Sequence, residues 1–233
     1  MELLQFRNVH ELALKGAKLC ETIFMSSPVV QEGIILSGGN TPISMYDSLV
    51  RLNPEVRDNI SIFFGDERVV PPDSGDSNYR AAGSMLRAIG FPEPRIYRIR
   101  TELGPEEAAE KYEADIRKFT ESGGIFKIAF LGLSAQGVTA SLLDRRLLSA
   151  ERIAVPVKAN DVNSGIRVSP MVDRVTLTPA FFEKVERIIF LVTGYAKRRI
   201  LEKLLSAPRE TIAGEATAKH NAVEIWADSD ALG

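Results

Sequence analysis

Four apolar runs that each end in glycine constrain the fold of this chain most strongly. They span residues 33–39, 60–65, 125–132 and 188–194, and they are rich in isoleucine, phenylalanine and leucine. Runs of this length without regular polar alternation are typical of strands that are buried on both faces. Helical patterns separate them, so they predict a three-layer α/β fold. Its mostly parallel, Rossmann-like sheet has helices on both faces.

The remaining elements are expected from hydrophobic periodicity and from turn residues. We expect helices near 12–24, 43–52, 79–89, 105–120, 136–148 and 196–205, strands at 153–157 and 223–227, loops at 69–78 and 158–166, and an extended segment at 174–179 that leads into a short helix. No linker divides the chain, which predicts one domain over residues 1–233.

Composition narrows the class of protein. The chain has 29 Lys and Arg, 31 Asp and Glu and no long basic run, which argues against a nucleic-acid or membrane partner. It shows no leader and no apolar run of membrane-spanning length, so we expect a cytoplasmic protein, a monomer or weak homo-oligomer. The single cysteine, Cys20, lies in an amphipathic pattern and is expected to be buried. His10 and His220 stand far apart and lack metal-ligand spacing, so no metal site is expected.

Polar or glycine-rich turns follow the four apolar runs. Their residues are 37–42, 65–68, 131–137 and 193–197. Ligands of open parallel sheets bind outside the carboxyl ends of the strands, so these turns are expected to meet at one edge. The sequence therefore predicts a single site there.

The turn Ser37–Pro42 has the composition of an anion-binding loop. Gly38 and Gly39 allow a ligand to approach the backbone, and Ser37 and Thr41 offer hydroxyl groups. The start of the next helix offers free N–H groups to an anion. An ordinary tight turn between strand and helix explains the same residues, and the glycine spacing and lysine of a P-loop are missing.

Charged residues near these turns are candidates for substrate contacts. Arg174 and Lys197 can hold a phosphate, although for each residue taken singly an ordinary surface charge is the simpler interpretation. Asp66 and Glu67 follow a buried strand, where a carboxylate can act as an acid or base or can bind sugar hydroxyls. Alternatively, such a carboxylate caps a turn or pairs with Arg68.

Five motifs in this order resemble those of the 6-phosphogluconolactonases, in the glucosamine-6-phosphate isomerase/6-phosphogluconolactonase superfamily. They are Ser37-Gly-Gly-Asn-Thr-Pro, Asp66-Glu-Arg-Val-Val-Pro with Ser77-Asn78, Leu131-Gly through Thr139-Ala-Ser-Leu, Arg174-Val-Thr-Leu, and Gly194 with Lys197. The resemblance implies hydrolysis of 6-phospho-D-glucono-1,5-lactone to 6-phosphogluconate in the pentose phosphate pathway, without a cofactor. It implies a substrate site made of Ser37, Gly38, Gly39, Asn40, Thr41, Arg68, Asn78, Arg174 and Lys197.

One motif departs from the family pattern. Where the family has Asp-Gly-His, this chain has Gln136, Gly137 and Val138. The resemblance makes that histidine the general base that activates water, and valine cannot move a proton. His220 is a candidate replacement, although its polar surroundings are typical of a surface histidine.

Three interpretations follow from the missing histidine. In the first, the chain is a lactonase of reduced activity, in which Asp66 or Glu67 is the base. In the second, it is a non-catalytic or regulatory protein that binds sugar phosphates. In the third, it is an isomerase or deaminase that acts on another phosphosugar.

Overall fold

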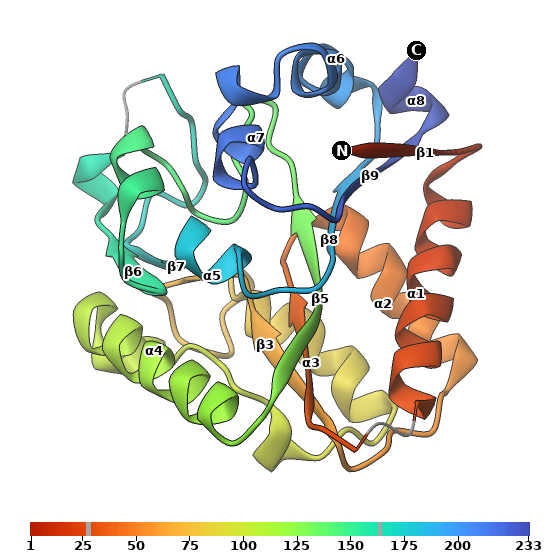
Figure 1. Ribbon diagram of the computed structural model, residues 1–233, viewed down its shortest axis with the longest axis vertical. Coiled ribbons are helices and arrows are strands. Elements are labelled where there is room, and N and C mark those ends of the chain that lie inside the picture. Colours follow the sequence, from red (N-terminus) through yellow and green to blue (C-terminus); the bar gives the residue numbers. More distant parts are fainter. Residues whose placement is uncertain (27–28, 163–164) are drawn as a thin grey trace.

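A six-stranded parallel sheet forms the centre of the computed structural model, which describes residues 1–26, 29–162 and 165–233 (Figure 1). In spatial order its strands are β1 (Glu2–Phe6), β9 (Val223–Asp228), β8 (Ile188–Val192), β5 (Ile125–Gly132), β2 (Glu32–Leu36) and β3 (Ile60–Phe64). Every pair of neighbours in this sheet is parallel. The expected α/β fold is thus confirmed, and β1 is an additional edge strand that the sequence analysis did not predict.

A second, three-stranded antiparallel sheet lies beside the first. Its order is β4 (Asp66–Arg68), β7 (Arg174–Leu177) and β6 (Ala154–Val157). Only Gly65 separates β3 from β4, so the chain passes directly from one sheet into the other. The β4–β7 register pairs Asp66 with Thr176 and Arg68 with Arg174. The strands β6 and β7 match the strand expected at 153–157 and the extended segment expected at 174–179. The strand β4 was not predicted, because three charged residues after a glycine have the composition of a turn.

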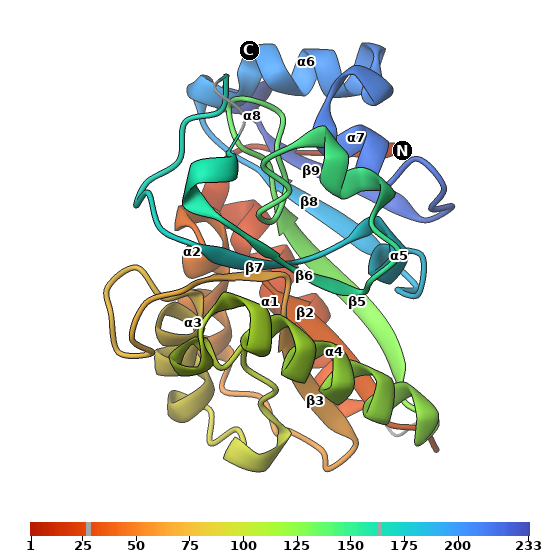
Figure 2. The same ribbon diagram turned by 90° about the vertical axis from the view of Figure 1, so that its left-hand side faces the viewer.

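Helices cover both faces of the parallel sheet (Figures 1 and 2). The first face carries α1 (Val9–Met25), α2 (Asn40–Leu52) and α3 (Asn78–Ala88). The second carries α4 (Pro105–Glu121), α5 (Pro179–Phe182), α6 (Arg198–Ser206), α7 (Ile212–Ala216) and α8 (Ser229–Leu232). Short 3-10 turns lie at η1 (Glu93–Arg95), η2 (Thr101–Leu103), η3 (Arg145–Ser149), η4 (Ala159–Asp161), η5 (Tyr195–Lys197) and η6 (Pro208–Glu210).

Alternate residues of each central strand enter different hydrophobic clusters. Ile34 packs with the helices of the first face, whereas the next residue, Ile35, packs with those of the second. Successive side chains of a strand point to opposite faces, so two clusters flank one sheet. Cys20 is buried in the first cluster, as expected, and burial raises the pKa of its thiol to about 12.

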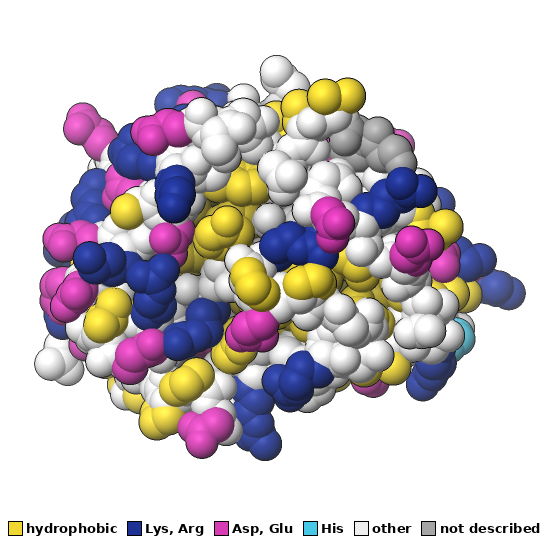
Figure 3. Space-filling view, turned by 90° about the horizontal axis from the view of Figure 1, so that it is seen from below, with side chains coloured by type: hydrophobic (Ala, Val, Ile, Leu, Met, Phe, Trp, Pro, Cys, Tyr) yellow, Lys and Arg dark blue, Asp and Glu magenta, His cyan; other side chains and the backbone are white. Residues whose placement is uncertain are grey.

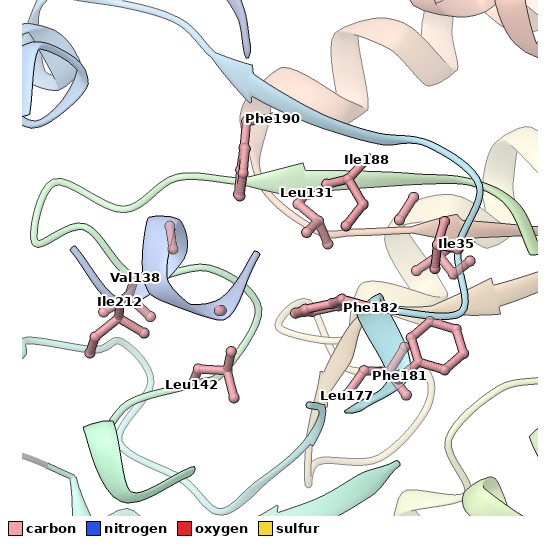
Figure 4. Packing of buried hydrophobic residues seen from close by; sticks show 14 of the residues in the cluster. Ile35, Leu131, Val138, Leu142, Leu177, Phe181, Phe182, Ile188, Phe190 and Ile212 are labelled. Atoms are coloured by element: carbon pink, nitrogen blue, oxygen red, sulfur yellow. The ribbon is translucent and has the colours of Figure 1, made fainter. Parts of the chain in front are cut away.

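The helix expected at residues 136–148 is wrong. The backbone forms irregular turns over 136–144, with positive φ at Gly137 (78°) and Ala140 (47°), and only the short 3-10 turn η3 follows. The Ser134 hydroxyl accepts the N–H groups of Gln136 and Val138, and this holds the turn. The apolar residues of this segment have the spacing of a helical face, which is why a helix was predicted. In the structure the same side chains are buried, but the backbone that carries them is irregular. Val138 lies in the second cluster with Ile212 (Figure 4).

Charges of both signs are mixed on the face shown in Figure 3. Among the residues that the structure describes, no helix has the length and apolarity needed to cross a membrane. The same ranges contain no group of three or more His, Cys, Asp or Glu side chains arranged to hold a metal ion.

Candidate active site

A cavity of about 480 Å³ lies at the carboxyl ends of β2, β5 and β8, between the two sheets. All four predicted turns contribute to its wall, as does Arg174 of β7. The lining residues are Ser37, Gly38, Gly39, Asn40, Thr41, Pro42, Asp66, Arg68, Asn78, Gly132, Leu133, Ser134, Val138, Ala140, Arg174, Leu191, Thr193 and Lys197. The structure therefore brings together every residue of the expected substrate site.

The loop between β2 and α2 presents backbone N–H groups at the cavity wall. Gly39, with φ of 105°, precedes α2, and no side chain caps this helix. The N–H groups of Asn40 and Thr41 have no acceptor within the helix, because they belong to its first turn. The Thr41 hydroxyl lies 2.5 Å from that of Thr193 and joins this loop to the one after β8. These groups form a local environment that favours an anion.

Gly38 is required by the close approach of Asn78. A Cβ atom at position 38 would lie 1.8 Å from Asn78 Oδ1. Asn78 is buried and donates from Nδ2 to both the carbonyl and the Oδ1 of Asp66, each at 3.0 Å. Its amide is therefore not free to move aside.

Replacing Gly38 by alanine is expected to displace Asn78 and to lower the free energy of unfolding by roughly 1–3 kcal/mol, the usual effect of an overpacked core. Thermal denaturation measures this loss. Gly65→Ala is the matched control, because its added Cβ would meet its nearest neighbours at 3.6–3.8 Å, in ordinary contact. Equal melting temperatures for the two variants would contradict the close packing of Gly38 and Asn78.

Asp66 is the only carboxylate among the described residues of the cavity wall. Its side chain is buried, and its two oxygens are held from opposite sides. Asn78 donates to Oδ1 at 3.0 Å, and the Ser141 hydroxyl donates to Oδ2 at 2.5 Å. A carboxylate has about four acceptor positions. Asp66 therefore retains lone pairs that can accept a proton from a molecule in the cavity.

Glu67 lies outside the cavity wall and holds the start of α3. Its Oε1 accepts the N–H groups of Arg68 and Asn78, and its Oε2 accepts the Tyr79 N–H and the Ser77 hydroxyl. Burial raises the pKa of Glu67, while the three backbone hydrogen bonds act in the opposite direction. Of the two roles considered for Glu67, this geometry favours capping.

Three cationic side chains line the same cavity as Asp66. They are Arg68, Arg174 and Lys197. Arg174 is 5% exposed, and it donates to the Pro170 carbonyl at 3.0 Å, while its Nε has no hydrogen-bond partner in the described part of the chain. Within the described ranges, neither Arg174 nor Lys197 forms an ion pair within 4.0 Å. Burial lowers the pKa of both groups. An anionic ligand would compensate these charges.

Only part of the motif Gln136-Gly137-Val138, which departs from the family pattern, contributes to the cavity wall. Val138 lines the cavity and is buried, whereas Gln136 is exposed and outside the lining. His220 is absent from the lining, and both of its ring nitrogens are engaged: Nε2 with the Val185 carbonyl at 2.6 Å and Nδ1 with the Ala222 N–H at 3.0 Å. His10 is exposed at the start of α1. Neither histidine therefore replaces the missing base.

Sequence reasoning did not single out Ser141 or Thr193. Ser141 is fully buried and bonds to Asp66, and Thr193 lines the cavity and contacts Thr41. Ser141 lies in the Thr139-Ala-Ser-Leu motif, which was the available signal. Only the paired register of β4 and β7 places that motif next to Asp66.

The fold and the cavity define a class: a parallel α/β protein with a predominantly cationic cavity at the carboxyl ends of its strands. Within that class, the chain belongs to the glucosamine-6-phosphate isomerase/6-phosphogluconolactonase family, whose model matches residues 10–226. It is 32% identical over 207 residues to a 6-phosphogluconolactonase of Aggregatibacter actinomycetemcomitans, and 31% identical over 208 residues to one of Haemophilus influenzae. Each alignment covers 85% of both chains.

Solved structures show the same similarity. The crystal structure of 6-phosphogluconolactonase from Thermotoga maritima is 26% identical, with a TM-score of 0.78 and 97% coverage of both chains. A crystal structure of devB protein is also 26% identical, with a TM-score of 0.85, covering 99% of this chain and 97% of that one. A monomeric glucosamine-6-phosphate deaminase has a TM-score of 0.82 at 19% identity, which shows the fold alone.

Proposed function

We propose that this chain hydrolyses 6-phospho-D-glucono-1,5-lactone to 6-phosphogluconate in the pentose phosphate pathway. The observation that carries the proposal is the placement of one carboxylate, Asp66, in the same cavity as Arg174 and Lys197. Relatives named 6-phosphogluconolactonase, which match 85% of the chain, support this choice of substrate. The activity belongs to one domain, residues 1–233, that is cytoplasmic and a monomer or weak homo-oligomer.

The cationic groups would bind the phosphate. Arg174 can donate two parallel hydrogen bonds from its guanidinium, and Lys197 adds a point charge. The N–H groups of the first turn of α2 and the hydroxyl of Thr41 complete a set of donors. The phosphate thereby anchors the sugar, so that the lactone carbonyl is held in the remaining part of the cavity.

Asp66 would act as the general base. A water molecule attacks the lactone carbonyl carbon as its proton passes to the Asp66 carboxylate. The tetrahedral intermediate then breaks the bond between that carbon and the ring oxygen. The ring oxygen takes the proton from Asp66, and the new carboxylic acid ionises in water. No cofactor is required by this balance of atoms and charges.

Val138 is expected to make this catalyst slower than family members that carry histidine at the matching position. Loss of a positioned base typically lowers the rate by roughly 10²–10⁴-fold. Groups that bind the substrate and stabilise the developing negative charge retain part of the catalysis.

Replacing Val138 by histidine is expected to raise kcat for the lactone by at least about tenfold, because a second base then faces the cavity. Initial rates above the spontaneous hydrolysis measure the effect. Val138→Gln is the control. Glutamine is polar and similar in length to histidine, but it does not accept a proton at neutral pH.

The wild-type rate itself tests the proposed function. A rate equal to the spontaneous one, together with binding of 6-phosphogluconate, would overturn hydrolysis and leave a non-catalytic sugar-phosphate binder. Turnover of a phosphosugar amine or ketose in place of the lactone would instead identify a deaminase or isomerase. A wild-type rate above background that Val138→His does not raise would show that residue 138 lies outside the reach of the substrate.

A further inference from the structure

Ser141 connects the carboxylate of the cavity to its most deeply buried cation. The Ser141 hydroxyl donates to Asp66 Oδ2 at 2.5 Å, and Arg174 Nη1 donates to the Ser141 oxygen at 3.4 Å. Ser141 has no exposed surface, and Asp66 and Arg174 are at most 7% exposed. These three residues come from a turn and from two strands of the second sheet, and they meet only in the fold.

The direction of these hydrogen bonds is determined by the donors and acceptors present. A serine hydroxyl has one hydrogen to donate, and guanidinium groups only donate. Because Arg174 occupies an acceptor position of the Ser141 oxygen, the hydroxyl hydrogen is directed to Asp66.

The backbone of Ser141 is fixed as well. Its N–H donates to the Thr176 hydroxyl at 3.1 Å, which in turn donates to the Leu177 carbonyl at 3.0 Å. Ser141 is therefore held by β7 while it holds Asp66 of β4. Asn78 holds the other oxygen of the same carboxylate.

We infer that Ser141 is a positioning residue for hydrolysis, which orients the Asp66 carboxylate toward the bound lactone and keeps Arg174 beside it. This inference rests on the proposed function, because it assigns Ser141 an effect through Asp66. Without the hydroxyl, the Asp66 carboxylate loses one of its two side-chain supports and can rotate. Small misplacement of a reacting group lowers the rate, whereas Arg174 remains held by the Pro170 carbonyl.

The kinetic test is Ser141→Ala. We expect kcat to fall about tenfold, within the losses that misplacement of a reacting group causes, while KM changes less than about twofold. In an Asp66→Asn background, the same substitution is expected to have no further effect on kcat, because Ser141 acts only through the carboxylate. An unchanged kcat, a rise confined to KM, or full additivity of the two substitutions would overturn the inference.

Ser26→Ala is the matched control. The Ser26 hydroxyl has two acceptors for its one hydrogen, the Ile23 carbonyl at 2.7 Å and the buried carboxylate of Glu32 at 3.0 Å. Glu32 lies at the amino end of β2, opposite the cavity. This variant also removes a hydroxyl that lies within hydrogen-bond distance of a buried carboxylate, but its kcat and KM are expected to match those of the wild type. A similar loss of kcat in Ser26→Ala would show that general destabilisation, not positioning, explains the effect.

A spectroscopic measurement tests Ser141 independently of activity. In protein with ¹³C-labelled aspartate carboxyl groups, the Asp66 signal is assigned by its loss in Asp66→Asn. We expect Ser141→Ala to move this signal, because the 2.5 Å hydrogen bond is lost, and Ser26→Ala to leave it in place. An unmoved Asp66 signal would overturn the inference even in an active enzyme. A moved signal in a protein without lactonase activity would contradict the proposed function and leave the Ser141 contact established.

Discussion

Asp66→Asn is expected to lower kcat for lactone hydrolysis by roughly 10²–10⁴-fold, the usual effect of removing a positioned base. Asparagine retains the shape of the side chain, but its single amide oxygen can accept from only one of the two donors, Ser141 or Asn78. One buried hydrogen bond is therefore lost, and the free energy of unfolding should fall by about 1 kcal/mol. Binding of 6-phosphogluconate should be retained or tightened, because the substitution removes the negative charge that faces Arg174. Initial rates and titration calorimetry measure the two effects separately.

The control for this substitution is Asp144→Asn, which changes an aspartate that caps the short turn η3 and does not line the cavity. Its rate is expected to equal that of the wild type. Glu67→Gln tests the other candidate base. If Glu67→Gln abolished turnover without loss of stability while Asp66→Asn remained active, the assignment of the base to Asp66 would be wrong.

Arg174→Ala is expected to weaken 6-phosphogluconate binding by at least about 100-fold, since two hydrogen bonds to a charged group contribute roughly 1.5 kcal/mol each or more. Stability is expected to change little. Among the described residues, the buried guanidinium has no ion pair and its Nε has no hydrogen-bond partner, so its removal also relieves a desolvation cost. Titration calorimetry and thermal denaturation together distinguish a binding role from a structural one.

Arg146→Ala provides the control for Arg174. Arg146 is an exposed arginine that pairs with Asp144 at 3.0 Å, and it is not part of the cavity wall. Its substitution should leave the affinity unchanged. Lys197→Ala is expected to weaken binding less than Arg174→Ala, because lysine contributes a point charge rather than a paired contact. Unchanged affinity in both cavity variants would contradict the phosphate site.

The strands that form the centre of the fold could be predicted from the sequence because each is apolar along its whole length. The runs at 33–39 and 188–194 correspond to β2 and β8, with the glycine-containing turns outside the strands. The same reasoning predicted that the turns meet at one edge, since this follows from the parallel direction of the strands. Local composition was sufficient to predict a strand wherever burial on both faces of the sheet requires apolar residues at every position.

The strand β4, the pairing of the second sheet and the irregular backbone at residues 136–144 could not be predicted in this way, although the extended segments that form β6 and β7 were expected. The strand β4 is three residues long, and its position depends on pairing with β7, more than 100 residues later in the chain. The burial of Val138 likewise depends on distant residues such as Ile212. For the same reason, the sequence offered Asp66 and Glu67 as equivalent, although only Asp66 faces the cavity.

The passage from β3 to β4 through the single residue Gly65 has a mechanical consequence. One side of the cavity, with Lys197 and the start of α2, belongs to the large sheet, and the other side, with Arg174, belongs to the small one. A phosphosugar that contacts both sides would add a non-covalent link between two sheets that the chain and the Gly65 backbone hydrogen bonds already join. Binding in the cavity would then favour one angle between the two sheets, and a change in that angle would change the affinity.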